Sequence, residues 1–417
     1  MNIRRRTLAI ALASALLVAV PASSAPSGPP TQVWIDVATH SMPGMPDLGA
    51  MGGLGGMAAR MMGGGENTLD YPDARTQMMP GKFFDIAMLN RPAPGQPSEQ
   101  LVPAGLGLGA SLPLLPPKSV VHTEQPGSNP EMPDAEIRLK FYWGCGGEVR
   151  AGQPRELHLR AKGGKFEFSG DPMQGRYAPD RDVRPDPSYV LWPNPKTRNR
   201  APANASLAGA HRITGPGVPE SLKFELQPAA DFMPKIALTQ SGDLATGMTL
   251  GWQPVDRSKA YFLHAVSMQD KTTIVLWSSA EVPDAGSGIV DFLTGGQVDR
   301  WLKEKVLLPP STTSCAIPKG IFAGGGNATP PMLSMIAYGP ETHIAWPPKP
   351  ADPKQPWNPE WNVRVRTKST AGAMLGMDLS GMEGMDTGAG GTPQEPGQKP
   401  AEESTGKKLL KGLLRNL

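Results

Sequence analysis

The sequence predicts a mainly β protein: an antiparallel β-sandwich-like fold with one or two short helices, flanked by disordered Gly/Met/Pro-rich arms. Glycine and proline are abundant, with 49 and 47 residues among 417, and a proline costs about 3 kcal/mol inside a helix. Several stretches of strand length alternate apolar and polar residues. Trp252 ends one such stretch and an aromatic pair at 261–262 begins the next, which is typical of two sheets packed face to face.

The N-terminus has the three parts of a secretory signal peptide. Arginines at positions 4 to 6 precede an apolar run over 8–20, and small residues follow it. The run is about a dozen residues, too short to cross about 30 Å of hydrocarbon as a helix. We expect removal of residues 1–22 and a mature chain in the periplasm or outside the cell. No later apolar stretch is longer, so no transmembrane segment is expected in the mature chain.

Residues 23–134 are predicted to form a mostly irregular arm rich in methionine, glycine and proline. Two apolar stretches within it, 33–37 and 83–89, have the length and composition of strands that add to a downstream sheet. The proline-rich stretches 92–117 and 126–133 are expected to be extended spacers.

A first β domain is predicted over 135–240, where regular alternation begins. Its strands are expected at 137–143, 157–159, 166–168, 221–226 and 235–238. Residues 171–205 are rich in proline and charged residues, so they are expected to form a long surface loop with one apolar island at 189–192.

A second β segment with a short helix is predicted over 241–370. Its strands are expected at 248–252, 260–266, 272–278, 333–338 and 362–367. The helical residues fall within 287–306. Gly295 and Gly296 favour two short helices there, because each glycine costs about 1 kcal/mol in a helix.

Two cysteines, Cys145 and Cys315, lie far apart in a chain that is expected to reach an oxidising compartment. An even number of cysteines in that setting favours a disulfide between them. The alternative is two separate buried thiols that pack as small apolar residues.

The end of the chain is predicted to be a disordered Met/Gly/Pro-rich linker over 371–406, followed by a basic amphipathic helix over 407–417. The apolar face of this helix consists of Leu409, Leu410, Leu413, Leu414 and Leu417. Such a helix is suited to an anionic lipid surface or to docking on an envelope protein partner.

The methionine-rich tracts carry the clearest chemical signal in the sequence. Thioether sulfur is a soft ligand that suits Cu(I), so the first tract predicts a copper site. Its candidate ligands are His40, Met42, Met45, Met57, Met61 and Met62. Two alternatives remain: a low-complexity linker with loosely packed methionines, and a surface that scavenges oxidants. No other cofactor is expected.

Three tryptophans, Trp346, Trp357 and Trp361, are interleaved with prolines near the end of the second β segment. Exposed indole rings of this kind can form a binding surface for sugar or peptide ligands. The alternative is that the rings pack as a lid on the sandwich.

The sequence assigns no catalytic residue. Gly286-Ser287-Gly288 lacks the outer glycines of a nucleophile elbow and suits the start of a helix instead. The net charge of +3 comes from mixed signs without a basic stripe, so no nucleic-acid surface is expected. We therefore expect an exported envelope protein with a binding or structural role. A periplasmic copper-handling protein that uses the methionine tracts is the second hypothesis, and an envelope hydrolase is the third.

Overall fold

The computed structural model describes residues 28–45, 71–76, 79–117, 135–162, 165–171, 173, 175–178, 183–197, 199–324 and 328–377. Over these residues the protein is mainly β, as predicted, with mostly antiparallel sheets of ten, four and three strands. None of the helices in these ranges is long and apolar enough to cross a membrane.

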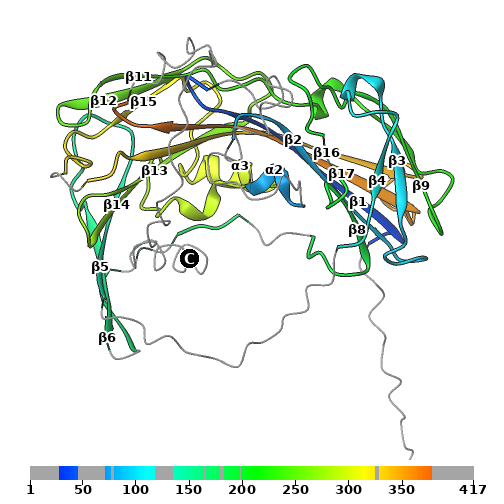
Figure 1. The fold of residues 1–417 in the computed structure, drawn as a ribbon, viewed down its shortest axis with the longest axis horizontal. Helices are drawn as coiled ribbons and strands as arrows, with labels where there is room; N and C mark the ends of the chain where they lie inside the picture. Colours follow the sequence, from blue (N-terminus) through cyan, green and yellow to red (C-terminus); the bar gives the residue numbers. More distant parts are fainter. Residues whose placement is uncertain are drawn as a thin grey trace, which may run out of the picture.

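The ten-stranded sheet, here called the main sheet, forms an arch (Figure 1). In spatial order its strands are β7 (Lys165–Gly170), β6 (Arg155–Lys162), β5 (Ala135–Trp143), β14 (Thr273–Ser278), β13 (Ala260–Met268), β16 (Met332–Trp346), β17 (Trp361–Met374), β1 (Thr31–Ser41), β2 (Gly81–Asn90) and β8 (Tyr189–Trp192). Two neighbouring pairs are parallel, β1 with β17 and β14 with β5.

Two smaller sheets cover the outer face of the arch (Figure 1). The β9 sheet contains β10 (Lys223–Leu226), β9 (Gly209–Thr214), β3 (Ser98–Leu101) and β4 (Ser111–Leu114). The β12 sheet contains β11 (Leu238–Asp243), β12 (Gly247–Trp252) and β15 (Ser314–Ile317). Odd-numbered residues of β17 pack under both: Val363 and Val365 under the β9 sheet, Ala371 and Ala373 under the β12 sheet. Because side chains alternate along a strand, both contacts are on one face of the main sheet.

The helices α2 (Asp73–Thr76) and α3 (Gly295–Lys303) lie on the inner face of the arch (Figure 1). Short 3-10 turns are η1 (Ala104–Leu106), η2 (Pro228–Ala230) and η3 (Ser287–Ile289). α3 begins at Gly295, and the Thr294 side chain accepts a hydrogen bond from the Gln297 N–H, so Thr294 is the N-cap. The Tyr338 hydroxyl of β16 donates to the Ile289 carbonyl, which attaches η3 to the same inner face.

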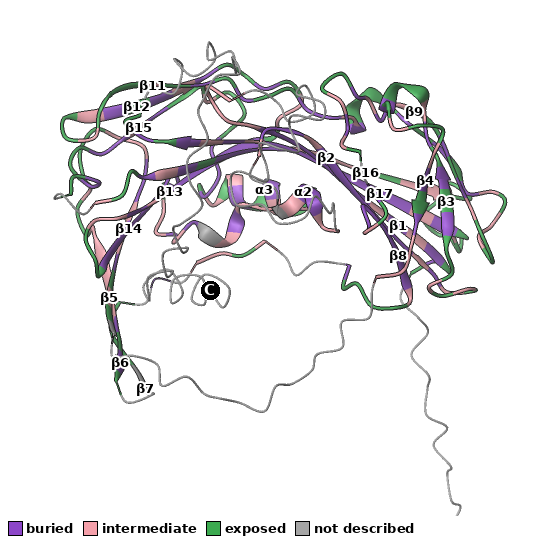
Figure 2. Cartoon of the chain, viewed as in Figure 1, coloured by how far each residue is buried: buried purple, intermediate pink, exposed green. Residues whose placement is uncertain are grey.

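β1 and β2 belong to the centre of the structure. β1 pairs with β17 on one side and with β2 on the other, and most of its residues are buried. Figure 2 shows buried residues along these middle strands of the arch. The alternation in the sequence predicted both strands. It could not show that β1 pairs with the last strand described.

Three expected boundaries need correction. The region 92–117 is not a spacer, because it contains β3, η1 and β4. Its Pro113 lies in β4 at the edge of the β9 sheet, where a missing N–H is tolerated. β8 lies within the expected loop 171–205, and its four residues are all buried. β17 continues to Met374, beyond the predicted linker boundary at 371, because it pairs there with β16.

The predicted disulfide between Cys145 and Cys315 is present, with the two Cα atoms 5.0 Å apart. It joins the segment after β5 to β15, so it connects the main sheet to the β12 sheet. Beside it, the Trp277 indole N–H donates to the Gly144 carbonyl at 3.1 Å.

Candidate functional site

A layer of charged side chains, all buried except the half-buried Asp291, lies between the main sheet and the segments on its inner face. This charged layer consists of Asp36, Arg75, Asp85, Asp291, Arg364, Arg366 and Lys368. Its members on β1, β2 and β17 alternate with the apolar residues that face outward. The sequence predicted the strand from this alternation of valine and arginine, but it gave no sign that the arginines are buried.

Asp36 is the centre of the charged layer. Its carboxylate accepts two hydrogen bonds from the Arg366 guanidinium, both at 2.8 Å, and another from Arg75. Burial alone would raise the pKa of Asp36, but Arg366 and then Arg75 hold that pKa well below its usual range. Arg75 also reaches the Asp291 carboxylate at 3.2 Å. Asp36 therefore stays ionised and ties α2 to the sheet.

Phe292 lies among three cations of the charged layer. The Lys368 Nζ is 4.2 Å from the ring centroid, and the guanidinium carbons of Arg366 and Arg75 are 5.3 Å and 5.6 Å from it. Cations over an aromatic face are attracted to its quadrupole. Burial lowers the pKa of Lys368, while Asp291 acts in the opposite direction.

Asp85 and His40 complete this side of the sheet. The Asp85 carboxylate accepts from the backbone N–H groups of Asp73 at 2.7 Å and Ala74 at 3.1 Å, and burial raises its pKa well above the usual value. The His40 Nδ1 shares a hydrogen bond with the Thr370 hydroxyl. Burial, and then the charge of Lys368, lower the pKa of His40 to about 3.

The charged layer is built as a structural network. Perturbed pKa values mark catalytic sites or structural ion pairs, and the two differ in access to substrate. The three carboxylates of the layer each bond to groups of the protein itself: Asp36 to Arg366 and Arg75, Asp291 to Arg75 and Lys368, and Asp85 to two backbone N–H groups. We interpret the charged layer as the contact that fixes α2 and the segment before α3 on the sheet.

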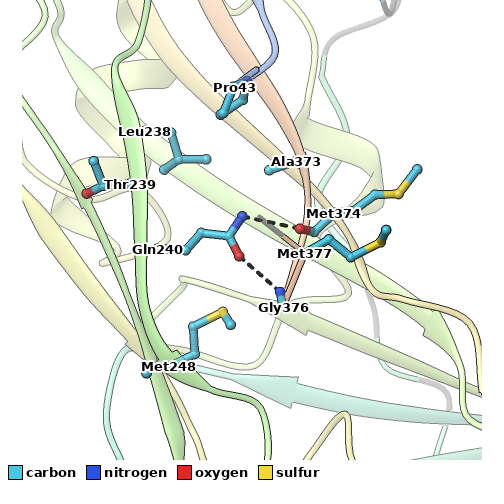
Figure 3. Close-up of a pocket in the computed structure, with 10 residues that line it drawn as sticks. Pro43, Leu238, Thr239, Gln240, Met248, Ala373, Met374, Gly376 and Met377 are labelled. Carbon is cyan, nitrogen blue, oxygen red and sulfur yellow. Dashed lines mark hydrogen bonds between the residues drawn. The ribbon is translucent and has the colours of Figure 1, made fainter. Parts of the chain in front are cut away.

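The larger cavity, about 410 Å³, lies at the end of β17, between the β11–β12 hairpin and the turn after β1 (Figure 3). Its lining is Pro43, Leu238, Thr239, Gln240, Gly242, Met248, Ala373, Met374, Gly376 and Met377. The Gln240 amide fixes the chain after β17: its Nε2 donates to the Met374 carbonyl at 3.2 Å, and its Oε1 accepts from the Gly376 N–H at 3.1 Å.

Three methionines line this cavity in two groups. Met374 and Met377 are 38% and 44% exposed, and their side chains extend on the same side of the chain (Figure 3). Met248 is 2% exposed and lies on another wall.

Met42 joins Met374 and Met377 at this end of the sheet. The parallel register pairs Ser41 with Ala371, so Met42 follows beside Gly372. A Cβ atom on Gly372 would lie 3.6 Å from the Met42 methyl carbon. The two methionine-rich tracts therefore leave the sheet at the same end. We call Met42, Met374 and Met377 the methionine corner.

The six candidate copper ligands are not brought together within the described residues. His40 lies in β1 and bonds to Thr370, whereas Met42 and Met45 lie in the turn that follows, where the Met45 N–H donates to the Met42 carbonyl at 3.0 Å. Met57, Met61 and Met62 lie outside the described residues. Over the described ranges, no group of three or more His, Cys, Asp or Glu side chains could hold a metal ion.

The three tryptophans divide between surface and core. Trp346 and Trp357 are 49% and 37% exposed, and the Trp357 indole donates to the Pro347 carbonyl at 2.9 Å. Trp361 is 2% exposed, packs under the β9 sheet and donates to the Ser221 hydroxyl at 3.1 Å. An aromatic surface of all three rings is therefore wrong, because alternation along β17 places Trp361 on the face that the β9 sheet covers.

The five leucines of the predicted C-terminal helix lie outside the described residues. A scan against models of protein families and a search of curated proteins found no match to this chain. Function is therefore inferred from the geometry of the sites.

Proposed function

We propose that this protein is an exported binding protein of the cell envelope, and that its ligand binds where β1 and β17 end. The observation that carries the proposal is the cavity of about 410 Å³ beside the methionine corner. Cavities of about 300–1,000 Å³ are typical of small-molecule sites. The lining is largely apolar, with one amide, Gln240, held in place by two hydrogen bonds.

The lining favours binding over hydrolysis. General acid–base catalysis needs a titratable side chain within hydrogen-bond reach of the substrate. The ten described residues that line the cavity contain no Asp, Glu, His, Cys, Lys or Arg. An envelope hydrolase therefore has less support at this site than a binding protein.

Export is part of the proposal. The signal-peptide pattern of residues 1–22 supports it, and so does the Cys145–Cys315 disulfide, since disulfides persist in oxidising compartments. The basic amphipathic segment 407–417 supports contact with an anionic lipid surface or an envelope partner.

The test is to fill the cavity with a larger side chain. Ala373 lines it and is 3% exposed, so Ala373→Phe adds a ring to the cavity (Figure 3). We expect saturable fluorescence enhancement of 1-anilinonaphthalene-8-sulfonate with the native protein and its loss in the variant. Because Ala373 also packs in the core under the β12 sheet, the larger side chain is expected to cost about 1–3 kcal/mol, and the unfolding midpoint of the variant checks that it remains folded.

Thr249→Phe is the matched control, because it adds the same ring at an exposed position of β12 that does not line the cavity. It should bind the dye as the native protein does. Equal dye binding by folded Ala373→Phe, or no saturable binding by the native protein, would contradict the proposal.

A further inference from the structure

We propose that the thioether sulfurs of the methionine corner, Met42, Met374 and Met377, form a Cu(I) site. This inference rests on the proposed function, since it names the ligand class bound at the same end of the sheet. It differs from the copper site predicted from sequence, because two of its ligands come from the second methionine tract.

The register of the two parallel strands brings the first ligand into place. His40 pairs with Thr370 and Ser41 with Ala371, so the next residue, Met42, reaches Gly372. A Cβ atom on Gly372 would be in ordinary van der Waals contact with the Met42 methyl, at 3.6 Å. The thioether of Met42 therefore lies close to β17.

The other two ligands come from β17 and the turn after it. Met374 shares a strand face with Gly372, because alternate residues of a strand point the same way. Gly376 has φ +77°, a left-handed conformation that glycine adopts readily, and it turns the chain between Met374 and Met377. Figure 3 shows both methionine side chains on the same side of this turn.

Two hydrogen bonds from β11 hold the backbone of the turn. The Gln240 amide bonds to the backbone on both sides of residue 375, to the Met374 carbonyl and to the Gly376 N–H. A binding group on a fixed backbone loses less conformational entropy when its ligand arrives. The large exposed fractions of Met374 and Met377, 38% and 44%, leave both thioethers accessible.

The donor set selects a soft cation. Thioether sulfur suits Cu(I), whereas carboxylate and imidazole suit harder or borderline ions. The described lining of the adjoining cavity has neither group. Thioethers carry no proton at neutral pH, so Cu(I) binding releases none.

The test compares two triple variants of the full chain. Met42→Leu, Met374→Leu and Met377→Leu together remove the three sulfurs while keeping side-chain volume. Met57→Leu, Met61→Leu and Met62→Leu remove as many sulfurs from the first tract. Each protein is titrated with Cu(I) under anaerobic conditions in competition with bicinchoninate.

We expect the corner variant to lose affinity about tenfold or more, and the tract variant to keep native affinity. The native affinity should change little between about pH 7 and about pH 5, whereas an imidazole site would weaken there. The single variant Met377→Leu, at an exposed position, should weaken Cu(I) binding without changing the unfolding midpoint.

Native affinity in the corner variant would overturn the inference. So would loss of copper in the tract variant alone, or failure of the native protein to compete with bicinchoninate. If the native protein does not bind copper but its cavity still binds the dye, the proposed function stands and only this inference fails. If the native protein binds copper but not the dye, the Cu(I) site of the methionine corner is supported and ligand binding in the cavity is contradicted.

Discussion

At the scale of single residues, Asp36 is a position where a substitution is expected to destabilise the fold, because it lies at the centre of the charged layer. The guanidinium groups of Arg366 and Arg75 both bond to this buried carboxylate, and Arg75 also reaches Asp291. A buried ion pair adds little compared with an apolar pair, but removal of one partner leaves an uncompensated buried charge. The cost of a substitution therefore depends on burial more than on the number of ion pairs.

Asp36→Asn should lower the free energy of unfolding by about 3–5 kcal/mol, because Arg366 would lose the carboxylate charge beside it and Arg75 would keep only its pair with Asp291. Urea denaturation followed by circular dichroism measures this. Asp171→Asn is the control, since its pair with Arg155 is 58% and 39% exposed, and exposed pairs contribute about 0–1 kcal/mol. Equal losses in the two variants would refute the distinction.

His264 gives a pH-dependent test of burial. Burial lowers its pKa from 6.5 to about 4. Between about pH 6.5 and about pH 4 the unfolded chain therefore binds a proton on His264 that the folded chain excludes. The stability that the neutral, buried His264 contributes is present above about pH 6.5 and is lost as pH falls toward about 4. Asp85, whose pKa is raised by burial, acts in the opposite direction, so the measurement must compare variants.

Relative to the native protein, His264→Asn should reduce the slope of unfolding free energy against pH by up to about 1.4 kcal/mol per pH unit in that interval. His343→Asn is the control, because the His343 side chain is 64% exposed. Urea titrations at several pH values provide the slopes. An unchanged slope for His264→Asn would show that the imidazole is protonated in the folded state.

At the scale of elements, the sequence predicted the strands better than their partners. The alternation around 137–143 and 362–367 marked β5 and β17 correctly, since a pleated strand places neighbours on opposite faces. The same alternation arises whether the polar face meets water or a buried ion-pair layer. The charged layer and the methionine corner both depend on long-range pairing, so no local pattern revealed them.

The disulfide should stabilise the contact between the main sheet and the β12 sheet. It links positions 170 residues apart, and a cross-link over a long loop restricts the unfolded chain strongly. The double variant Cys145→Ala, Cys315→Ala should lose about 2–5 kcal/mol of unfolding free energy. Thiol titration of unreduced, denatured native protein should find no free thiol, and two free thiols per chain would refute the bond.

At the scale of the whole molecule, one arched sheet unites parts of the chain that the sequence seemed to separate. Strands from the predicted arm, the first β domain and the second β segment all pair in the main sheet. The two smaller sheets then cover one face, while α2 and α3 cover the other. The sequence predicted a mostly irregular arm over 23–134 with two strands that add to a downstream sheet, and these two strands are β1 and β2, with β1 buried between β2 and β17.

The pairing of β1 with β17 also sets the order of events during folding. Asp36 and Arg366, which meet across these strands, are 330 positions apart. Contacts between such distant positions form slowly, because a large loop must close first. β1 leaves the ribosome before its partner β17, which is the last strand described. β1 therefore stays without its β17 partner until synthesis has passed residue 374, and until then β2 is the only neighbour in the main sheet with which it can pair.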